Sequence, residues 1–287
     1  MIKKGDTIGI IALAGPCEKN KIKLAKENLE NLGFNVILSS NIYDEDKYLA
    51  GSDKEKIKEL HSFFMNPNIK LILNARGGYG SLRLINKIDY DLIRQNPKPF
   101  CGYSDITALL LMFYKKCGLI TYHGLMACSD FTQSDFNQNT ISNFFNFMNS
   151  KEIEIKSTKT YNKGFAEGIL WGGNLATVVS LCGQDFIPDE DFIFFTEDIN
   201  EPVYKIDKMF TQIFNIEKFK TNCKGIVLGE FLNVDNKLWL EDLYKEFSIP
   251  TIMIDKITHS IEKITLPIGE KAYIKENLLI IKREGCL

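Results

Sequence analysis

Residues 99–111, PFCGYSDITALLL, join a short apolar run to a helical pattern within a few positions. The run predicts a β-strand over 98–103, and the spacing that follows predicts a helix over 105–114. Ser104 therefore lies where a buried strand ends and a helix begins. In sheets of parallel strands, this edge is where ligand and catalytic sites are found.

The same alternation continues on both sides of this junction, through about the first 125 residues. Helices are expected between the strands; one begins near residue 20 and ends at Gly33, and others cover 54–67 and 80–88. Continuous apolar strands separated by helices indicate a parallel sheet covered on both faces. The predicted class is α/β, with a flavodoxin-like N-terminal domain. Its strands are expected at 7–13, 35–39, 70–75, 98–103 and 119–124.

The second half of the chain has a less regular pattern. Residues 126–165 are polar and rich in asparagine, and one helix is expected near 138–148. We expect an N-terminal domain over 1–150, a linker over 151–165 and a smaller, mixed α/β C-terminal domain over 166–287.

Composition excludes several classes of partner. The formal net charge is −2, so no overall field attracts nucleic acid or anionic lipid. No segment approaches the roughly 18 consecutive apolar residues of a membrane helix, and the N-terminal run is expected to be a strand rather than a signal peptide. The histidines are few and unclustered, so neither a metal site nor a cofactor is expected. Seven scattered cysteines predict reduced thiols in a cytoplasmic protein.

Ser104 has two interpretations that the residues leave open. As the N-cap of a helix it would stabilise the fold by about 1 kcal/mol. As a nucleophile it would stand on a turn between strand and helix, and the N–H of Asp105 would be placed to bind an oxyanion. The second glycine of the G-x-S-x-G motif is absent, because that position is Ile106.

The glycine-rich segment NARGGYGSLRL, residues 74–84, also joins a strand to a helical pattern. It fits neither of the common phosphate-binding motifs, and a tight turn would account for its glycines. Alternatively, Gly77 and Gly78 would let backbone N–H groups approach a reacting carbonyl. Arg76 could then bind a substrate carboxylate, with Arg83 as the second candidate.

A serine nucleophile needs a histidine base that a carboxylate orients. Glu197 and Asp198 follow an apolar run, so they could face a site at the end of a strand and supply this carboxylate. Alternatively, they belong to a solvated loop. His259 lies in a loop after the apolar strand expected at PTIMID (250–255), and it is the candidate base. Of the other histidines, His61 falls within a predicted helix, and His123 ends a strand and remains a rival base.

Six segments stand out, in chain order: RGGYGSLRLINKIDYDLI, GYSDITALL, TYHGLM, EGILWGGNLATVVSLCG, EDINEPVYKIDKM and LPIG. Taken together, these motifs resemble the LD-carboxypeptidases, a family that includes muramoyltetrapeptide carboxypeptidases and microcin-immunity serine peptidases. The resemblance covers about residues 74–269, and the N-terminal IALAGP matches more loosely. The chain departs from many relatives at Leu125 and Cys17.

This resemblance implies a catalytic triad of Ser104, Glu197 and His259, which completes a site between the two domains. It also implies a cytoplasmic, homodimeric enzyme that trims muropeptides or other small peptides, with no nucleic-acid or membrane partner. We place Gly78 and Asp105 in the oxyanion hole.

The resemblance also suggests substrate contacts and leaves other functions open. Arg76, Trp171 and Asn174 are predicted to contact substrate, although a tryptophan beside two glycines could equally belong to the core. The alternatives are a peptidase acting on microcin-type aminoacyl nucleotides, a non-catalytic binding protein and a nucleotide-binding enzyme.

Overall fold

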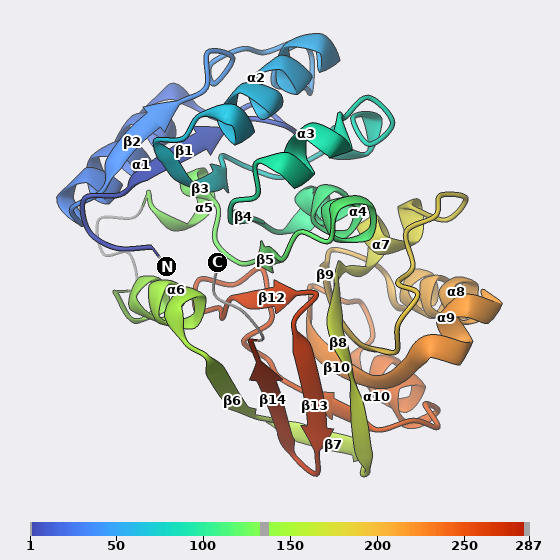
Figure 1. Ribbon diagram of the computed structural model, residues 1–287. Helices are drawn as coiled ribbons and strands as arrows, with labels where there is room; N and C mark the ends of the chain where they lie inside the picture. The colour runs from blue at the N-terminus through green and yellow to red at the C-terminus, as the bar shows by residue number, and fades with distance from the viewer. Residues whose placement is uncertain (1, 133–137, 284–287) are drawn as a thin grey trace. The chain divides into compact units, whose positions relative to one another are not determined.

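A computed structural model describes residues 2–132 and 138–283 of the chain. The chain divides into two compact units (Figure 1). Unit 1 comprises residues 1–149 together with 265–267, and unit 2 comprises residues 150–264 and 268–287. Among the described residues, no helix has both the length and the apolar character needed to cross a membrane.

Unit 1 is built on a six-stranded sheet with the order β12-β5-β4-β3-β1-β2. All four pairs among β1 to β5 are parallel, and the order 2-1-3-4-5 is that of flavodoxin-like folds. The expected fold of the N-terminal half is therefore confirmed. The strands are β1 (Thr7–Ile11), β2 (Asn35–Leu38), β3 (Ile69–Asn74), β4 (Phe100–Gly102), β5 (Thr121–His123) and β12 (Leu266–Ile268).

The helices of unit 1 follow the predicted alternation with one exception. The helix expected over 80–88 is wrong: only the 3₁₀ helix η1 (Ser81–Arg83) forms there, and α3 begins at Tyr90 behind the N-cap Asp89. Gly80, with φ at 143°, takes a conformation that a regular helix does not contain. The remaining helices are α1 (Lys19–Asn31), α2 (Asp53–Met65), α4 (Thr107–Cys117), α5 (Ala127–Asp130) and α6 (Gln138–Asn149).

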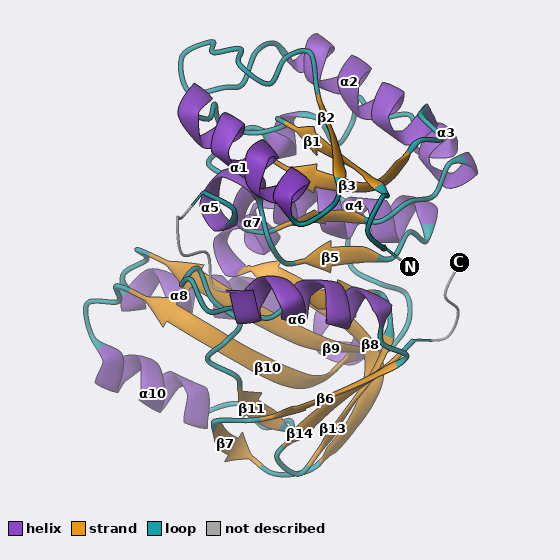
Figure 2. Cartoon of the chain, turned by 90° about the vertical axis from the view of Figure 1, so that its left-hand side faces the viewer, coloured by secondary structure: helices purple, strands orange, loops and turns teal. Residues whose placement is uncertain are grey.

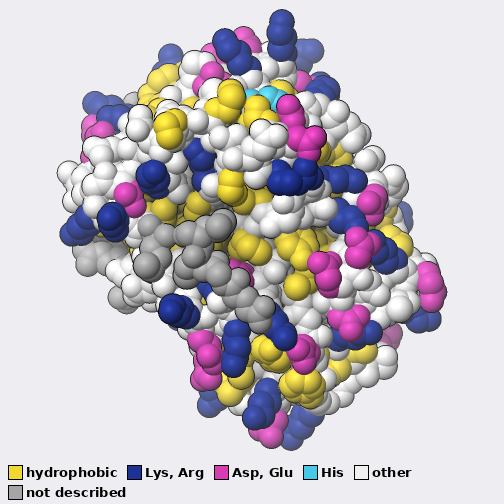
Figure 3. Space-filling view, in the orientation of Figure 1, with side chains coloured by type: hydrophobic (Ala, Val, Ile, Leu, Met, Phe, Trp, Pro, Cys, Tyr) yellow, Lys and Arg dark blue, Asp and Glu magenta, His cyan; other side chains and the backbone are white. Residues whose placement is uncertain are grey.

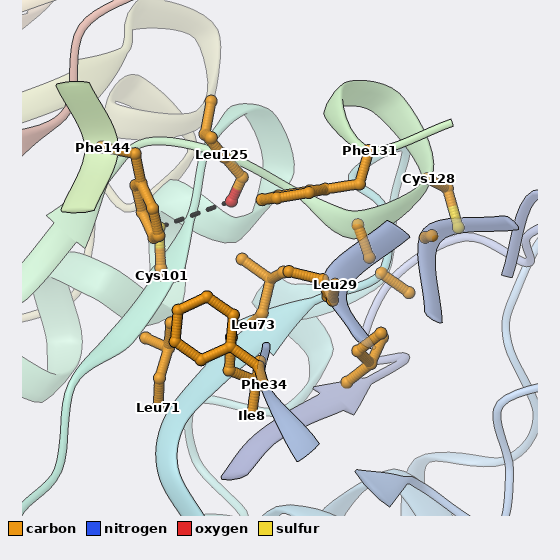
Figure 4. Close-up of a cluster of buried hydrophobic side chains, with 14 of the residues drawn as sticks. Ile8, Leu29, Phe34, Leu71, Leu73, Cys101, Leu125, Cys128, Phe131 and Phe144 are labelled. Atoms are coloured by element: carbon orange, nitrogen blue, oxygen red, sulfur yellow. Dashed lines mark hydrogen bonds between the residues drawn. The ribbon is translucent and has the colours of Figure 1, made fainter. Parts of the chain in front are cut away.

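The core of unit 1 lies on both faces of this sheet. On one face, Leu71 and Leu73 of β3 pack with Leu29 of α1 and with Phe144 of α6 (Figure 4). On the other face, α2 and α4 supply rings that pack on β4, including Phe113. Burial on both faces explains why these strands read as continuous apolar runs.

Cys17 and Cys128 correct the prediction that every cysteine is a reduced thiol. The two residues, 111 positions apart in the chain, form a disulfide in unit 1. Because the cysteines are widely spaced and form no C-x-x-C pair, the sequence contains no local signal for this pairing.

Unit 2 contains an eight-stranded mixed sheet with the order β6-β14-β13-β8-β9-β10-β11-β7 (Figure 2). The central strands β8 to β11 run parallel, and antiparallel strands flank them on both sides. The strands are β6 (Glu152–Lys156), β7 (Lys159–Asn162), β8 (Phe165–Asn174), β9 (Phe192–Ile199), β10 (Cys223–Leu232), β11 (Thr251–Met253), β13 (Lys271–Lys275) and β14 (Leu278–Lys282).

The stretch 151–165, which we expected to be a linker, is instead part of this sheet. β6 pairs with β14 and β7 pairs with β11, so the polar residues there lie on the two outermost strands. Outer strands are partly solvated, which is why their sequence resembles a loop. The helices of unit 2 are α7 (Leu175–Ser180), α8 (Val203–Phe214), α9 (Glu217–Asn222) and α10 (Lys237–Lys245).

Charged side chains are interspersed on the surface. On the face drawn in Figure 3, lysine and arginine alternate with aspartate and glutamate. This mixture is consistent with the small formal net charge of −2.

Candidate active site

Ser104 occupies a strained turn at the carboxyl end of β4. It is the first residue of the 3₁₀ helix η2 (Ser104–Ile106), and its φ is +60°. This left-handed conformation costs a residue with a side chain about 1–2 kcal/mol. The N-cap of α4 is Ile106, so the interpretation of Ser104 as the cap of that helix is wrong. The turn has the strand-to-helix form of a nucleophile elbow.

The glycine-rich loop after β3 lies directly against this turn. A Cβ atom added to Gly77 would stand 3.0 Å from Cβ and 3.2 Å from Oγ of Ser104, and 3.5 Å from the backbone N of Asp105. Gly78 lies against Gly15, whose N–H donates to the Gly77 carbonyl at 3.0 Å. A larger residue at position 77 would crowd the serine side chain, so that the loop or Ser104 would have to shift.

The side chain of Asp105 joins the serine turn to this glycine-rich loop. Its Oδ2 accepts the Ser81 N–H at 2.9 Å, and its backbone carbonyl accepts the Ser81 hydroxyl. Burial raises the pKa of Asp105, and these hydrogen bonds together with the nearby Lys56 ammonium oppose the rise. Two loops that follow adjacent strands are therefore fixed to each other beside Ser104.

The two candidate arginines differ in how their side chains are engaged. Arg76 is exposed, and its guanidinium donates to the Pro16 carbonyl at 2.9 Å. Arg83 instead forms a two-pronged pair with Asp53, at 3.1 and 3.0 Å. Burial favours a raised pKa at Asp53, but hydrogen bonds from Arg83 and Lys87 lower it to about 2. Because Arg83 is held in this network, Arg76 is the better candidate for binding a carboxylate.

The two histidines of unit 1 have structural surroundings. Nε2 of His61 accepts the N–H of Asp89 at 3.0 Å, and burial lowers the pKa of His61. His123 is buried at the end of β5, paired with Gly102 and packed edge-on against Tyr103.

Unit 2 brings together Glu197 and His259. Glu197 is completely buried on β9, and its Oε2 lies 2.5 Å from Nδ1 of His259, a residue 62 positions further along the chain. Gly229 of β10 makes room for this pair, because a Cβ there would stand 2.9 Å from Cβ of Glu197. A carboxylate on Nδ1 fixes the orientation and tautomer of the imidazole and leaves Nε2 as the nitrogen that exchanges a proton.

Asp198, the neighbour of Glu197, supports the local fold. It accepts hydrogen bonds at 2.8 Å from the Asn174 amide and from the N–H groups of Ala176 and Ile199. Burial, reinforced by the charge of Glu197, raises the pKa of Asp198 to about 6. The second acidic residue of the pair therefore anchors the start of α7.

Two predicted substrate contacts have structural roles. Trp171 is fully buried among the phenylalanines of unit 2, with its ring 5.1 Å from that of Phe192, so it is a core residue. Asn174 caps α7 by accepting the N–H of Thr177 at 3.1 Å, and it also donates to Asp198. A buried aromatic and a filled cap explain the WGGN segment through packing and helix capping.

Sequence reasoning missed Glu230, next to Gly229 on β10. Its carboxylate accepts hydroxyl groups from Thr258 and Ser260, the residues on either side of His259. No spacing rule connects Glu230 to His259, so only the fold reveals this contact. Over the described residues, no group of three or more His, Cys, Asp or Glu side chains is arranged to hold a metal ion.

The chain matches both domain profiles of one protein family. The profile of the LD-carboxypeptidase N-terminal domain matches residues 8–124, and that of the C-terminal domain matches residues 167–274. A probable murein peptide carboxypeptidase of Bacillus subtilis is 36% identical over 285 residues, covering 94% of this chain and 89% of the relative.

Two solved structures have the same fold. The MccF-like protein of Bacillus anthracis aligns with a TM-score of 0.90 and 30% identity, over 99% of this chain and 98% of its own. The muramoyltetrapeptide carboxypeptidase of Oxalobacter formigenes aligns with a TM-score of 0.88 and 28% identity, over 98% of this chain and 100% of its own.

Proposed function

Because the chain belongs to the LD-carboxypeptidase family, we propose that it is a serine carboxypeptidase that removes the terminal D-alanine from murein tetrapeptides. The observation that carries this proposal is the 2.5 Å contact between Glu197 and His259. A protein that only binds a small molecule needs no buried carboxylate on a histidine ring. The strained turn at Ser104 supplies the matching nucleophile.

The proposed reaction has the two steps of acyl transfer. Nε2 of His259 removes the proton of the Ser104 hydroxyl as its oxygen attacks the carbonyl before D-alanine, and Glu197 stabilises the imidazolium. The N–H of Asp105, with an N–H from the 77–78 segment, binds the oxyanion. The C–N bond breaks, D-alanine leaves with the proton from His259, and water then hydrolyses the acyl-enzyme.

Recognition of the substrate is assigned to Arg76. The terminal carboxylate of D-alanine matches the planar fork of a guanidinium, and Arg76 stands exposed two positions before Gly78 in the loop that contacts Ser104. The enzyme is proposed to act in peptidoglycan recycling, in the cytoplasm, and to assemble as a homodimer.

The likeness to the MccF-like protein favours one alternative, namely hydrolysis of a microcin-type aminoacyl nucleotide. The two functions share the same nucleophile and base. They differ in the leaving group, which is an amino acid in one case and a nucleotide derivative in the other. Purified enzyme should therefore be given both kinds of substrate.

The deciding experiment measures release of D-alanine from a muramoyl tetrapeptide by wild type and by Ser104→Ala. We expect release by wild type and a loss of about 10⁴-fold or more in the variant, because a triad acts as a unit. A fluorophosphonate probe should label wild type and leave the variant unlabelled. Equal D-alanine release by the two proteins would exclude Ser104 as the nucleophile. Hydrolysis of the aminoacyl nucleotide without any D-alanine release would favour the alternative function.

A further inference from the structure

The segment that carries His259 is held by a side chain from the neighbouring strand. We infer that Glu230 of β10 is a positioning residue: it fixes the 257–260 segment so that the His259 ring keeps its contact with Glu197 and its orientation as a base. The inference deepens the proposed function and rests on it, because it assigns a task to a residue outside the triad.

The contacts of Glu230 bracket the histidine on both sides. Its Oε2 accepts the Thr258 hydroxyl at 2.7 Å and the Ser260 hydroxyl at 3.3 Å. The Ser260 N–H in turn donates to Oγ1 of Thr258 at 3.0 Å. One carboxylate oxygen therefore gathers the two neighbours of His259 into a closed set of hydrogen bonds.

The backbone of the same strand supports this arrangement. The Glu230 N–H donates to the Ile257 carbonyl at 2.8 Å, and a Cβ at Gly229 would stand only 2.4 Å from that oxygen. β10 pairs with β9, the strand that carries Glu197. Both the partner of the imidazole and the anchor of its loop therefore come from adjacent strands of one sheet.

Glu230 contacts neither the ring of His259 nor a reacting atom in these interactions, so its effect must come from placement. Catalytic groups tolerate little displacement, and a shift of about 1 Å costs on the order of 100-fold in rate. A carboxylate also accepts hydrogen bonds more strongly than a neutral oxygen does. These properties suit an anchor for a loop that carries a general base.

The test measures D-alanine release by Glu230→Ala, Glu230→Gln and Thr258→Val. We expect kcat to fall about 30- to 100-fold in Glu230→Ala, with KM changed less than about 3-fold, since the placement of the base affects the chemical step. Glu230→Gln keeps one acceptor oxygen and should recover to within about 5-fold of wild type. Thr258→Val, which keeps the shape of the side chain and removes its hydroxyl, should resemble Glu230→Ala.

A matched control is available in the same unit. Glu217 accepts the Thr221 hydroxyl at 3.4 Å on α9, so Glu217→Ala removes a contact between the same two residue types. It should leave kcat unchanged. Normal kcat in a folded Glu230→Ala would overturn the inference, and so would an equal loss in Glu217→Ala.

A spectroscopic readout separates failure of the inference from failure of the proposed function. The hydrogen-bonded Nδ1 proton of His259 should give a resolved downfield NMR signal in wild type and in Glu230→Gln. It should broaden or move upfield in Glu230→Ala or, if that variant does not fold, in Thr258→Val. An unchanged signal would overturn the inference, whether or not the enzyme releases D-alanine. If wild type releases no D-alanine but the signal is still lost in Glu230→Ala, the result would support the inference and contradict only the proposed function.

Discussion

The serine region of unit 1 and the histidine region of unit 2 are built by different means. Around Ser104 the structure relies on backbone geometry: Ser104 is left-handed, and a Cβ added to Gly77 would stand 3.0 Å from the serine Cβ. Around His259 it uses buried charge and hydrogen bonds, with Glu197 fully buried and Glu230 holding the flanking residues. Unit 1 therefore depends on shape, and unit 2 depends on electrostatics.

The two regions should therefore tolerate different substitutions. A change that preserves volume but removes a charge should damage the histidine region most. A methyl group added at Gly77 should damage the serine region, because the backbone there lies close to the Ser104 side chain.

Glu197→Gln changes only charge and hydrogen bonding in the histidine region. We expect kcat for D-alanine release to fall about 10³- to 10⁴-fold, since an amide neither stabilises the imidazolium nor holds the required tautomer. Steady-state kinetics measure the effect. Glu241→Gln, a change of a lysine-paired carboxylate in the same unit, serves as the control and should be neutral. Activity above a tenth of wild type in Glu197→Gln would refute the assigned role.

Gly77→Ala adds one methyl group in the serine region. The new Cβ would stand 3.0 Å from Cβ of Ser104, so either the loop or the nucleophile must move. We expect kcat to fall about 100-fold, as for other small displacements of catalytic groups. Gly118→Ala is the control, because that glycine has φ at 67° and open space around it. The control should lose about 1 kcal/mol of stability from strain and keep its activity.

Asp198 provides a pH test of buried charge in unit 2. Its folded-state pKa of about 6 lies above the ordinary value of 3.8, so the folded state binds the proton more tightly than the unfolded state does. Protonation of Asp198 therefore stabilises the folded state. Its contribution to stability is complete below about pH 4 and is lost as the pH rises to about 6. The stability of wild type relative to Asp198→Asn should therefore fall by about 2 kcal/mol between pH 4 and pH 7. Denaturant unfolding at several pH values measures this, and a difference independent of pH would contradict the assignment.

The sequence predicted much of the fold because its signals are local. Apolar runs and helical spacings identified the parallel sheet of unit 1 and placed Ser104 at the end of β4. The sequence did not reveal that 151–165 forms outer strands, because those strands are polar and their pairing partners β11 and β14 follow about 90 to 130 residues later. Pairing over such distances has no local signature.

The candidate residues show the same limit. The sequence singled out Glu197 and His259, which the structure brings together, yet it also selected Trp171 and Asn174 from one conspicuous segment. Trp171 packs in the core and Asn174 caps a helix. Tryptophan and asparagine are common in these structural roles, so their presence in a motif does not distinguish structure from function. Glu230 was missed because only the folded chain brings its carboxylate to the Thr258 hydroxyl beside His259.

The strand β12 has a consequence for how genes of this kind can be recombined. The C-terminal domain profile covers residues 167–274, yet β12, at Leu266–Ile268, completes the sheet of the N-terminal unit beside β5. A chimaera that joins the N-terminal half of one relative to the C-terminal half of another therefore imports a foreign strand into its first sheet. A fragment ending near residue 149 would expose the bare edge of β5 and invite aggregation. Modules exchanged at the apparent domain boundary are compatible only when β5 and β12 are exchanged as a matched pair.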